Sequence, residues 1–146
     1  MDEAFGHWLA GFIDGEGCFG IHRLKREGRI CWALRFTLKL RSDDQPILEK
    51  CQRRTGAGCI RETKPPGHNP QAIWIVESRG GCEVIAAILD HFPLRAKKAR
   101  DYAIWGEALR EWGNGDTGHR WSGQRDWSRI AGFRAQLDET RAFSQK

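Results

Sequence analysis

The stretch that decides the fold is Trp8-Leu9-Ala10-Gly11-Phe12-Ile13-Asp14-Gly15-Glu16-Gly17, close to the N-terminus. As a helix it has two faces, and Phe5, Leu9 and Ile13 form an apolar stripe suited to the core. The second stripe consists of Trp8, Gly11, Phe12 and Gly15. A glycine costs about 1 kcal/mol inside a helix, so two of them indicate close packing against another backbone. We expect this stripe to be a dimer interface, because a two-fold axis can supply the partner from an identical chain.

The end of this predicted helix carries an acidic residue, Glu16, between Gly15 and Gly17. A carboxylate there faces the negative end of the helix dipole, about −0.5 charge, which is unfavourable unless a cation is present. The pattern from Leu9 to Gly17 resembles the signature of the LAGLIDADG homing endonucleases, with Glu16 where the family name has Asp. The signature occurs once. In that family, chains with one signature pair as homodimers, whereas chains with two act as pseudo-symmetric monomers.

Length and composition set the outer limits of the prediction. We expect the 146 residues to form a single endonuclease domain, 1–146, with a core over about 5–112 and a C-terminal helical extension over about 113–146. The chain has 24 Lys+Arg against 19 Asp+Glu, a net charge of +5, which fits a polyanionic partner. Five cysteines, an odd number without CxxC spacing, are interpreted as reduced and mostly buried thiols, not zinc ligands.

The N-terminus lacks a signal segment, and no apolar run is long enough to span a membrane. We therefore expect no membrane among the partners. We also expect no small-molecule substrate. The expected location is the cytoplasm of a prokaryote, associated with the nucleoid, or an organelle matrix if the chain is organelle-encoded.

Hydrophobic periodicity divides the rest of the chain. Phe19 and Ile21 alternate with Gly20 and His22, which predicts a strand, and a charged turn follows over 25–29. The clearest strand is 32–41, apolar on one face and basic on the other. Asp43 or Asp44 is expected to cap a helix with Pro46 in its first turn, ending near 54. Further strands are predicted near 58–63 and 72–77, with a proline-rich loop over 64–70.

Three more helices complete the prediction: one after Gly80-Gly81 that ends near 91, one over 97–112, and one from 127 to 143 that follows a glycine-rich loop over 113–123. The order is α-ββ-α-ββ-α with two helices appended. Because the strands arrive as hairpins, we predict an α+β fold with a curved antiparallel four-stranded sheet and helices on one face. The LAGLIDADG resemblance implies the same homing-endonuclease-like architecture.

The free face of such a sheet fits the major groove of double-stranded DNA, the expected partner. Alternation and the resemblance together place the following residues there: Gly20, His22, Ala33, Arg35, Thr37, Lys39, Arg41, Arg61, Thr63, Ile73 and Ile75. Arg35, Lys39 and Arg61 suit guanine O6 and N7. Three basic residues at the hairpin tip are expected to contact phosphates: Lys25, Arg26 and Arg29. Such contacts position the protein on DNA without selecting a base sequence. The opposite assignment, in which Trp74 and Val76 face the groove and Ile73 and Ile75 face the core, also stays open.

Strand cleavage requires an activated water and neutralisation of charge, which divalent ions supply. We expect Glu16, with the Gly15 carbonyl, to bind Mg²⁺, with Mn²⁺ substituting and Ca²⁺ supporting binding without cleavage. The resemblance implies cleavage of both strands with short 3′ overhangs. It also implies a lysine near the scissile phosphates within 93–101, where Lys98 is the candidate and Lys97 the alternative. Ser42 takes the place of a polar water-positioning residue, and Asp14 is assigned to hydrogen bonding at the helix end.

Three functions stay open on the sequence. The first is a site-specific double-strand DNA endonuclease that promotes intron homing. The others are a group I intron maturase, which would add RNA as a partner, and a catalytically inactive DNA-binding regulator. His68-Asn69 lacks the second histidine of an HNH nuclease, and 113–118 lacks the lysine of a phosphate loop. The tryptophans Trp105, Trp112, Trp121 and Trp127 favour helix packing, while 119–121 is a candidate for contact with flanking DNA.

Overall fold

The computed structural model describes residues 1–114 and 125–142. Its elements follow one another along the chain as α1 (Glu3–Glu16), β1 (Gly17–Arg26), β2 (Arg29–Arg41), the short 3₁₀ helix η1 (Ser42–Asp44), α2 (Gln45–Thr55), β3 (Cys59–Thr63), β4 (Gln71–Val76), α3 (Arg79–His91), α4 (Lys98–Asn114) and α5 (Ser128–Ala142). This order confirms the predicted α-ββ-α-ββ-α arrangement with two appended helices.

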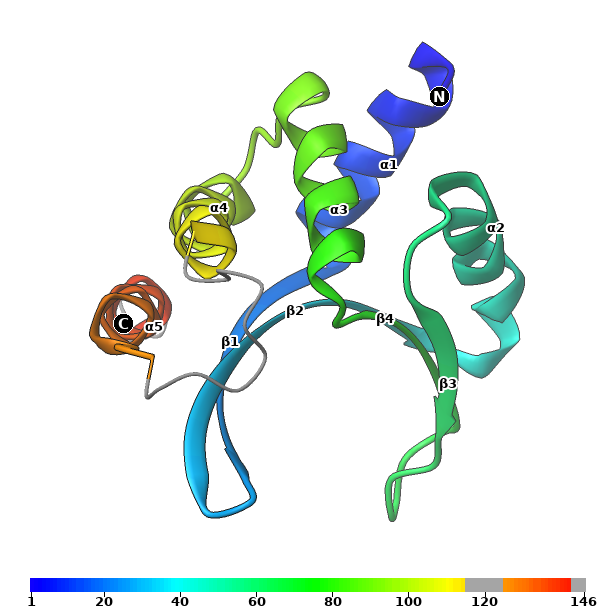
Figure 1. The fold of residues 1–146 in the computed structure, drawn as a ribbon. Helices are drawn as coiled ribbons and strands as arrows, with labels where there is room; N and C mark the ends of the chain where they lie inside the picture. Colours follow the sequence, from blue (N-terminus) through cyan, green and yellow to red (C-terminus); the bar gives the residue numbers. More distant parts are fainter. Residues whose placement is uncertain (115–124, 143–146) are drawn as a thin grey trace.

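The four strands form one antiparallel sheet in the order β1-β2-β4-β3, so the two hairpins meet through β2 and β4. In Figure 1 the sheet bends into an arch. The helices lie on its convex side, α4 and α5 beside β1 and α2 beside β3, and the concave side stays open between the two hairpin ends. The predicted curved sheet with helices on one face is therefore confirmed.

Alternating residues of the strands build the core against the helices. Phe19, Leu34, Phe36 and Trp74 are fully buried there, together with Leu9 and Ile13 from α1. Burying a side chain of this size stabilises the fold by about 1.5–3 kcal/mol. Trp74 and Val76 belong to the core, which leaves Ile73 and Ile75 on the opposite face. The predicted packing role of the tryptophans is confirmed for Trp105, Trp112 and Trp127, and Trp121 lies outside the described residues.

Several boundaries differ from the prediction for local reasons. The first hairpin turns on only two residues, Glu27 and Gly28, both with positive φ (50° and 77°), so the charged residues on either side belong to the strands. Asp44 stands at the N-cap position of α2 but makes no side-chain cap bond, and Asp43 accepts from Arg41 at 2.7 Å instead. The predicted cap is therefore wrong.

The third and fourth helices are longer than predicted. Ser78 accepts a hydrogen bond from the Gly81 N–H at 3.1 Å, which starts α3 at Arg79 and places Gly80 and Gly81 inside the helix. α4 continues to Asn114 and takes in the first two residues of the predicted loop, and the rest of that loop lies outside the described residues.

The five cysteines are free thiols. Burial raises the pKa of Cys51 to about 11 and that of Cys82 to about 12. Cys31 is half-buried and Cys18 and Cys59 are exposed, so the expectation of mostly buried thiols is wrong. No helix in the described part of the chain has the length and apolar character needed to cross a bilayer.

The bend between α2 and β3 gives a matched test of the packing. Gly56 and Gly58 both have positive φ, but an added Cβ meets nothing at Gly56 and lies 2.3 Å from the Ile75 carbonyl oxygen at Gly58. Gly56→Ala should lower the free energy of unfolding by about 1 kcal/mol. Gly58→Ala should lower it by about 3 kcal/mol, because a backbone atom of β4 must also move. Equal losses in denaturant unfolding would contradict this packing.

Candidate active site and nucleic-acid interface

The predicted metal ligand lies at the junction of α1 and β1. The helix ends at Glu16, and the strand begins at the next residue without a linker. The Gly17 N–H donates back to the Ile13 carbonyl, and a Cβ on Gly17 would lie 2.7 Å from that oxygen. Both Gly15 and Glu16 are exposed. The close approach at Gly17 thus holds the Glu16 carboxylate at the C-terminal end of the helix, open to solvent.

Asp14 connects this junction to the lysine-bearing segment. Its Oδ2 accepts hydrogen bonds from the Arg95 N–H at 2.7 Å and the Ala96 N–H at 2.9 Å. The chain then enters α4 at Lys98, which is half-buried, and Lys97 before it is exposed. Asp14 is structural, as predicted, but it binds the segment before α4 and not the end of its own helix. The structure therefore ties both candidate lysines to the helix that ends in Glu16.

Ser42 is brought to the same end of the sheet by strand register. Gly17 pairs with Leu38, so Glu16 precedes β1 at the end where Ser42 follows β2. Ser42 is half-buried, and its N–H donates to the Pro70 carbonyl at 3.0 Å.

The described side chains do not supply a complete set of metal ligands at Glu16. Within residues 1–114 and 125–142, no three His, Cys, Asp or Glu side chains are grouped so as to hold a metal ion. A cation at Glu16 would therefore take its other oxygens from water, a second chain or a ligand, as Mg²⁺ commonly does. The exposed carboxylate at a helix C-terminus fits such an ion.

Strand register defines the surface opposite the helices, which we call the concave face. Cross-strand neighbours on it include Gly20 with Arg35, Thr37 with Ile75, and Lys39 with Ile73 and Arg61. The same alternation along the strands also places on the concave face His22, Arg26, Arg29, Ala33, Arg41 and Thr63. Lys25 pairs with Ile30 and has the opposite parity to Arg26. The structure thus brings together the side chains predicted for base contact.

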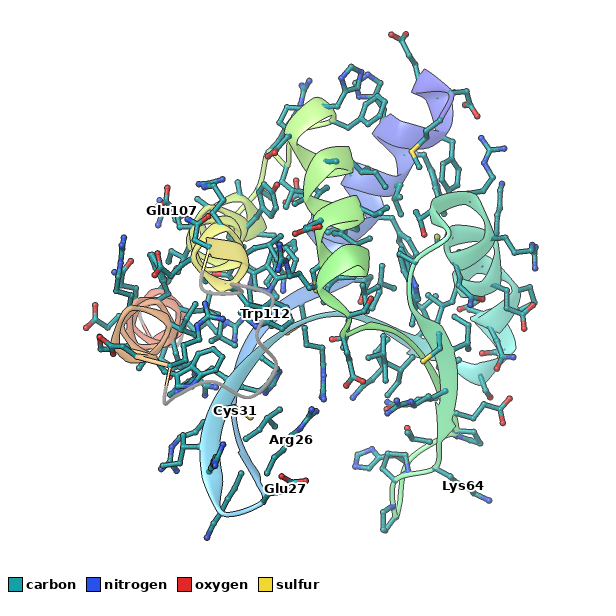
Figure 2. All side chains as sticks on the ribbon, in the orientation of Figure 1. Arg26, Glu27, Cys31, Lys64, Glu107 and Trp112 are labelled. Atoms are coloured by element: carbon teal, nitrogen blue, oxygen red, sulfur yellow. The ribbon has the colours of Figure 1, made fainter. Side chains whose placement is uncertain are left out.

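Register also places residues on the concave face that the sequence analysis did not single out: Leu24, Cys18, Cys31, Cys59 and Gln71. In Figure 2, Cys31 and Arg26 point into the hollow, and Lys64 lies towards the end of the other hairpin. Glu77, directly after β4, forms ion pairs with Arg35 at 2.5 Å and Arg61 at 3.5 Å. The alternation that places Ile73 and Ile75 on the concave face, continued by two residues, also places Glu77 there.

His22 is held in a restricted position on this face. A Cβ on Gly20 would lie 2.4 Å from the His22 Nε2, so the imidazole lies over the glycine. Burial lowers the pKa of His22, and the nearby Arg35, Arg134 and Arg141 lower it further. His22 is therefore neutral at pH 7 and suited to hydrogen bonding, not to neutralising a phosphate.

The glycine stripe of α1 faces outwards. Trp8 is 44% exposed and stacks on Phe12 with ring centroids 5.2 Å apart. Gly11 and Gly15 are exposed, and an added Cβ at either position meets no atom within 4 Å. The other side of α1, with Leu9 and Ile13, is buried in the core. The helix thus presents an aromatic and glycine surface on which another element can pack closely.

The fold and the site define a protein with a curved, largely basic sheet face and an exposed carboxylate at its rim. The profile of the LAGLIDADG endonucleases matches residues 9–109. The chain belongs to this family, as the signature predicted.

Individual proteins are similar to the chain in sequence or in fold. The chain is 33% identical over 107 residues, 73% of its length, to the probable intron-encoded endonuclease Cox1-I1b of Schizosaccharomyces pombe, and it covers 27% of that protein. It matches the LAGLIDADG meganuclease I-AabMI bound to uncleaved DNA with a TM-score of 0.66 and 25% identity, over 79% of this chain and 39% of that one. The homing endonuclease I-TnaI matches with a TM-score of 0.74 and 17% identity, over 94% and 95%.

The Asp14 contact can be tested through stability. Asp14→Ala removes a charged acceptor from two backbone N–H groups and should lower the free energy of unfolding by about 2 kcal/mol. Asp14→Asn keeps an oxygen acceptor of the same shape and should lose clearly less. Chemical denaturation of both variants measures the difference, and an Asp14→Ala variant as stable as the wild type would contradict the contact.

Proposed function

We propose that this chain is a site-specific double-strand DNA endonuclease that acts as a homodimer on a long, partly palindromic target. The observation that carries the proposal is the position of Glu16, exposed at the end of α1 and next to the strand that begins the concave face. Family membership supports the same reaction class. Because the chain spans about a quarter of the curated relative and two fifths of I-AabMI, its activity and partners are proposals for this chain.

The concave face suits the major groove in shape and charge. Eight strand residues at about 3.3 Å each span roughly 26 Å, or about eight base pairs. Arg35, Lys39 and Arg61 provide donors for guanine edges, whereas Arg26 and Arg29 at the end of the first hairpin reach towards phosphates. Two copies would cover about 16 base pairs, or about one and a half turns of DNA, and their two-fold relation accounts for a partly palindromic site.

The catalytic end of each copy would act on one DNA strand. Glu16, with the Gly15 carbonyl, would hold Mg²⁺, which supplies charge neutralisation and activation of water when bound. Lys98, or Lys97 in its place, would stabilise charge on the phosphate, and Ser42 would help to orient water. The hydrogen bonds of Asp14 to Arg95 and Ala96 support this arrangement, since they fix the lysine segment against α1.

The endonuclease proposal is tested by Glu16→Gln. The variant should bind the duplex selected by the wild type from a randomised library with Ca²⁺, and it should cut that duplex at least about 100-fold more slowly with Mg²⁺, because the amide is a poor ligand for a hard cation. Glu139→Gln, an exposed change on α5, is the matched control and should cut normally. Cleavage by Glu16→Gln at the wild-type rate would remove Glu16 from the mechanism. Binding without cleavage by the wild type would favour the DNA-binding regulator.

The homodimer proposal is tested on the outward stripe of α1. Gly11→Leu adds a side chain where this chain leaves open space, so the fold should be unaffected while the close approach of a second copy is blocked. Gly132→Leu, in the middle of α5 with equally open space, is the matched control. Sedimentation should show a dimer for the wild type and Gly132→Leu and a monomer for Gly11→Leu. A dimeric Gly11→Leu protein would contradict this interface.

A further inference from the structure

Glu77 is an acidic residue on a basic surface. At the described strand positions of the concave face the charged side chains are basic, namely Arg26, Arg29, Arg35, Lys39, Arg41 and Arg61. Glu77 follows β4 directly, and its carboxylate reaches across to β2 and β3. A carboxylate in this place repels DNA phosphates, so it weakens general attraction to DNA and requires another explanation.

The contacts of Glu77 show what it does in the free protein. Its Oε1 lies 2.5 Å from a terminal nitrogen of Arg35, and its Oε2 lies 3.5 Å from a terminal nitrogen of Arg61. Each carboxylate oxygen is therefore engaged by a different arginine, one on each side of β4. Side chains of Arg35 and Glu77 are only 39% and 38% exposed, so this pair is less screened by water than an ion pair at the rim.

The buried part of Arg35 limits which of its nitrogens can bind a base. Its Nε is buried and has no hydrogen-bond partner among the described residues. The terminal nitrogens are thus the ones that Arg35 can offer to a base, and Glu77 fixes the position of one of them. Arg61, with a 57% exposed side chain, is held more loosely by the other oxygen. Together these contacts restrict two long side chains that would otherwise sample many rotamers.

We propose that Glu77 is a specificity-determining residue, which holds Arg35 and Arg61 over the base edges and keeps them from the phosphates. This inference rests on the proposed function and concerns the same surface. An arginine fixed over the groove gains binding free energy mainly from guanine. A free arginine gains nearly as much binding free energy from any nearby phosphate. Glu77 therefore lowers the affinity for DNA in general and increases the difference between target and non-target sequences.

The test compares Glu77→Gln with Glu62→Gln, which removes the same charge from an exposed position of β3 whose cross-strand neighbour, Ala72, is in the core. The wild type first selects its site from a randomised duplex library with Ca²⁺. All three proteins are then titrated with the selected duplex and with an unrelated duplex over a range of salt concentrations. Thermal unfolding establishes that each protein is folded.

Glu77→Gln should bind the unrelated duplex more tightly, with a salt dependence steeper by about one phosphate contact, or about 0.9 in the slope of log K against log salt. Its discrimination between the two duplexes should fall about tenfold, and repeated selection should show weaker guanine preference at two base pairs. Glu62→Gln should retain the wild-type discrimination.

Four results would overturn the inference. If Glu77→Gln tightens binding to both duplexes equally, the carboxylate acts only through charge. If guanine preference is kept and a cytosine preference is lost, Glu77 reads a base itself. If Glu77→Gln behaves as Glu62→Gln, the ion pairs have no role in recognition. A wild-type protein that selects no sequence overturns the proposed function and this inference together, whereas selection by the wild type with unchanged discrimination in Glu77→Gln overturns this inference alone.

Discussion

The direct junction of α1 and β1 is the constraint on which the rest of the structure depends. No residue separates the helix from the strand, and the Gly17 N–H closes the last turn on the Ile13 carbonyl. A Cβ at this position would lie 2.7 Å from that oxygen, so the tight exit requires glycine. The direction of the helix is thereby fixed relative to the sheet. The same geometry buries Ile13 in the core and leaves Glu16, three residues later, at the surface.

β2, one of the two inner strands, separates the residues that build the core from those of the concave face through its period of two. On β2, Leu34, Phe36 and Leu38 are buried against the helices, while Arg35 and Thr37 between them face the open side. Because a strand cannot slip by one residue without exchanging its faces, the buried residues also fix which side chains the concave face presents. Changes on that face can therefore alter the proposed contacts with DNA at little cost to the core.

Local patterns in the sequence predicted the elements well, and contacts between distant segments escaped them. The signature from Leu9 to Gly17, the alternation along the strands, and the glycine and proline signals between them were sufficient for the order of elements, the sheet and its two faces. The Asp14 contact joins residues 81 and 82 positions apart, so no local pattern could reveal it. The predicted cap of α2 is absent: Asp43 is engaged by Arg41 at the end of β2, and Asp44 makes no side-chain cap bond. The alternation on β4 was sufficient to place Glu77 on the concave face, but its ion pairs could not be predicted because its partners lie on two other strands.

The last helix, α5, covers the sheet edge formed by β1. β1 is an edge strand, and exposed edges pair readily with other chains. From α5, Arg134 donates to the Ile21 carbonyl at 2.6 Å and Arg141 donates to the Phe19 carbonyl, with Asp101 close to Arg141. These side chains occupy backbone acceptors along β1, and the opposite edge strand, β3, has only five residues. This arrangement of the two sheet edges is consistent with the proposed contact between copies through the aromatic and glycine stripe of α1, next to which Glu16 lies.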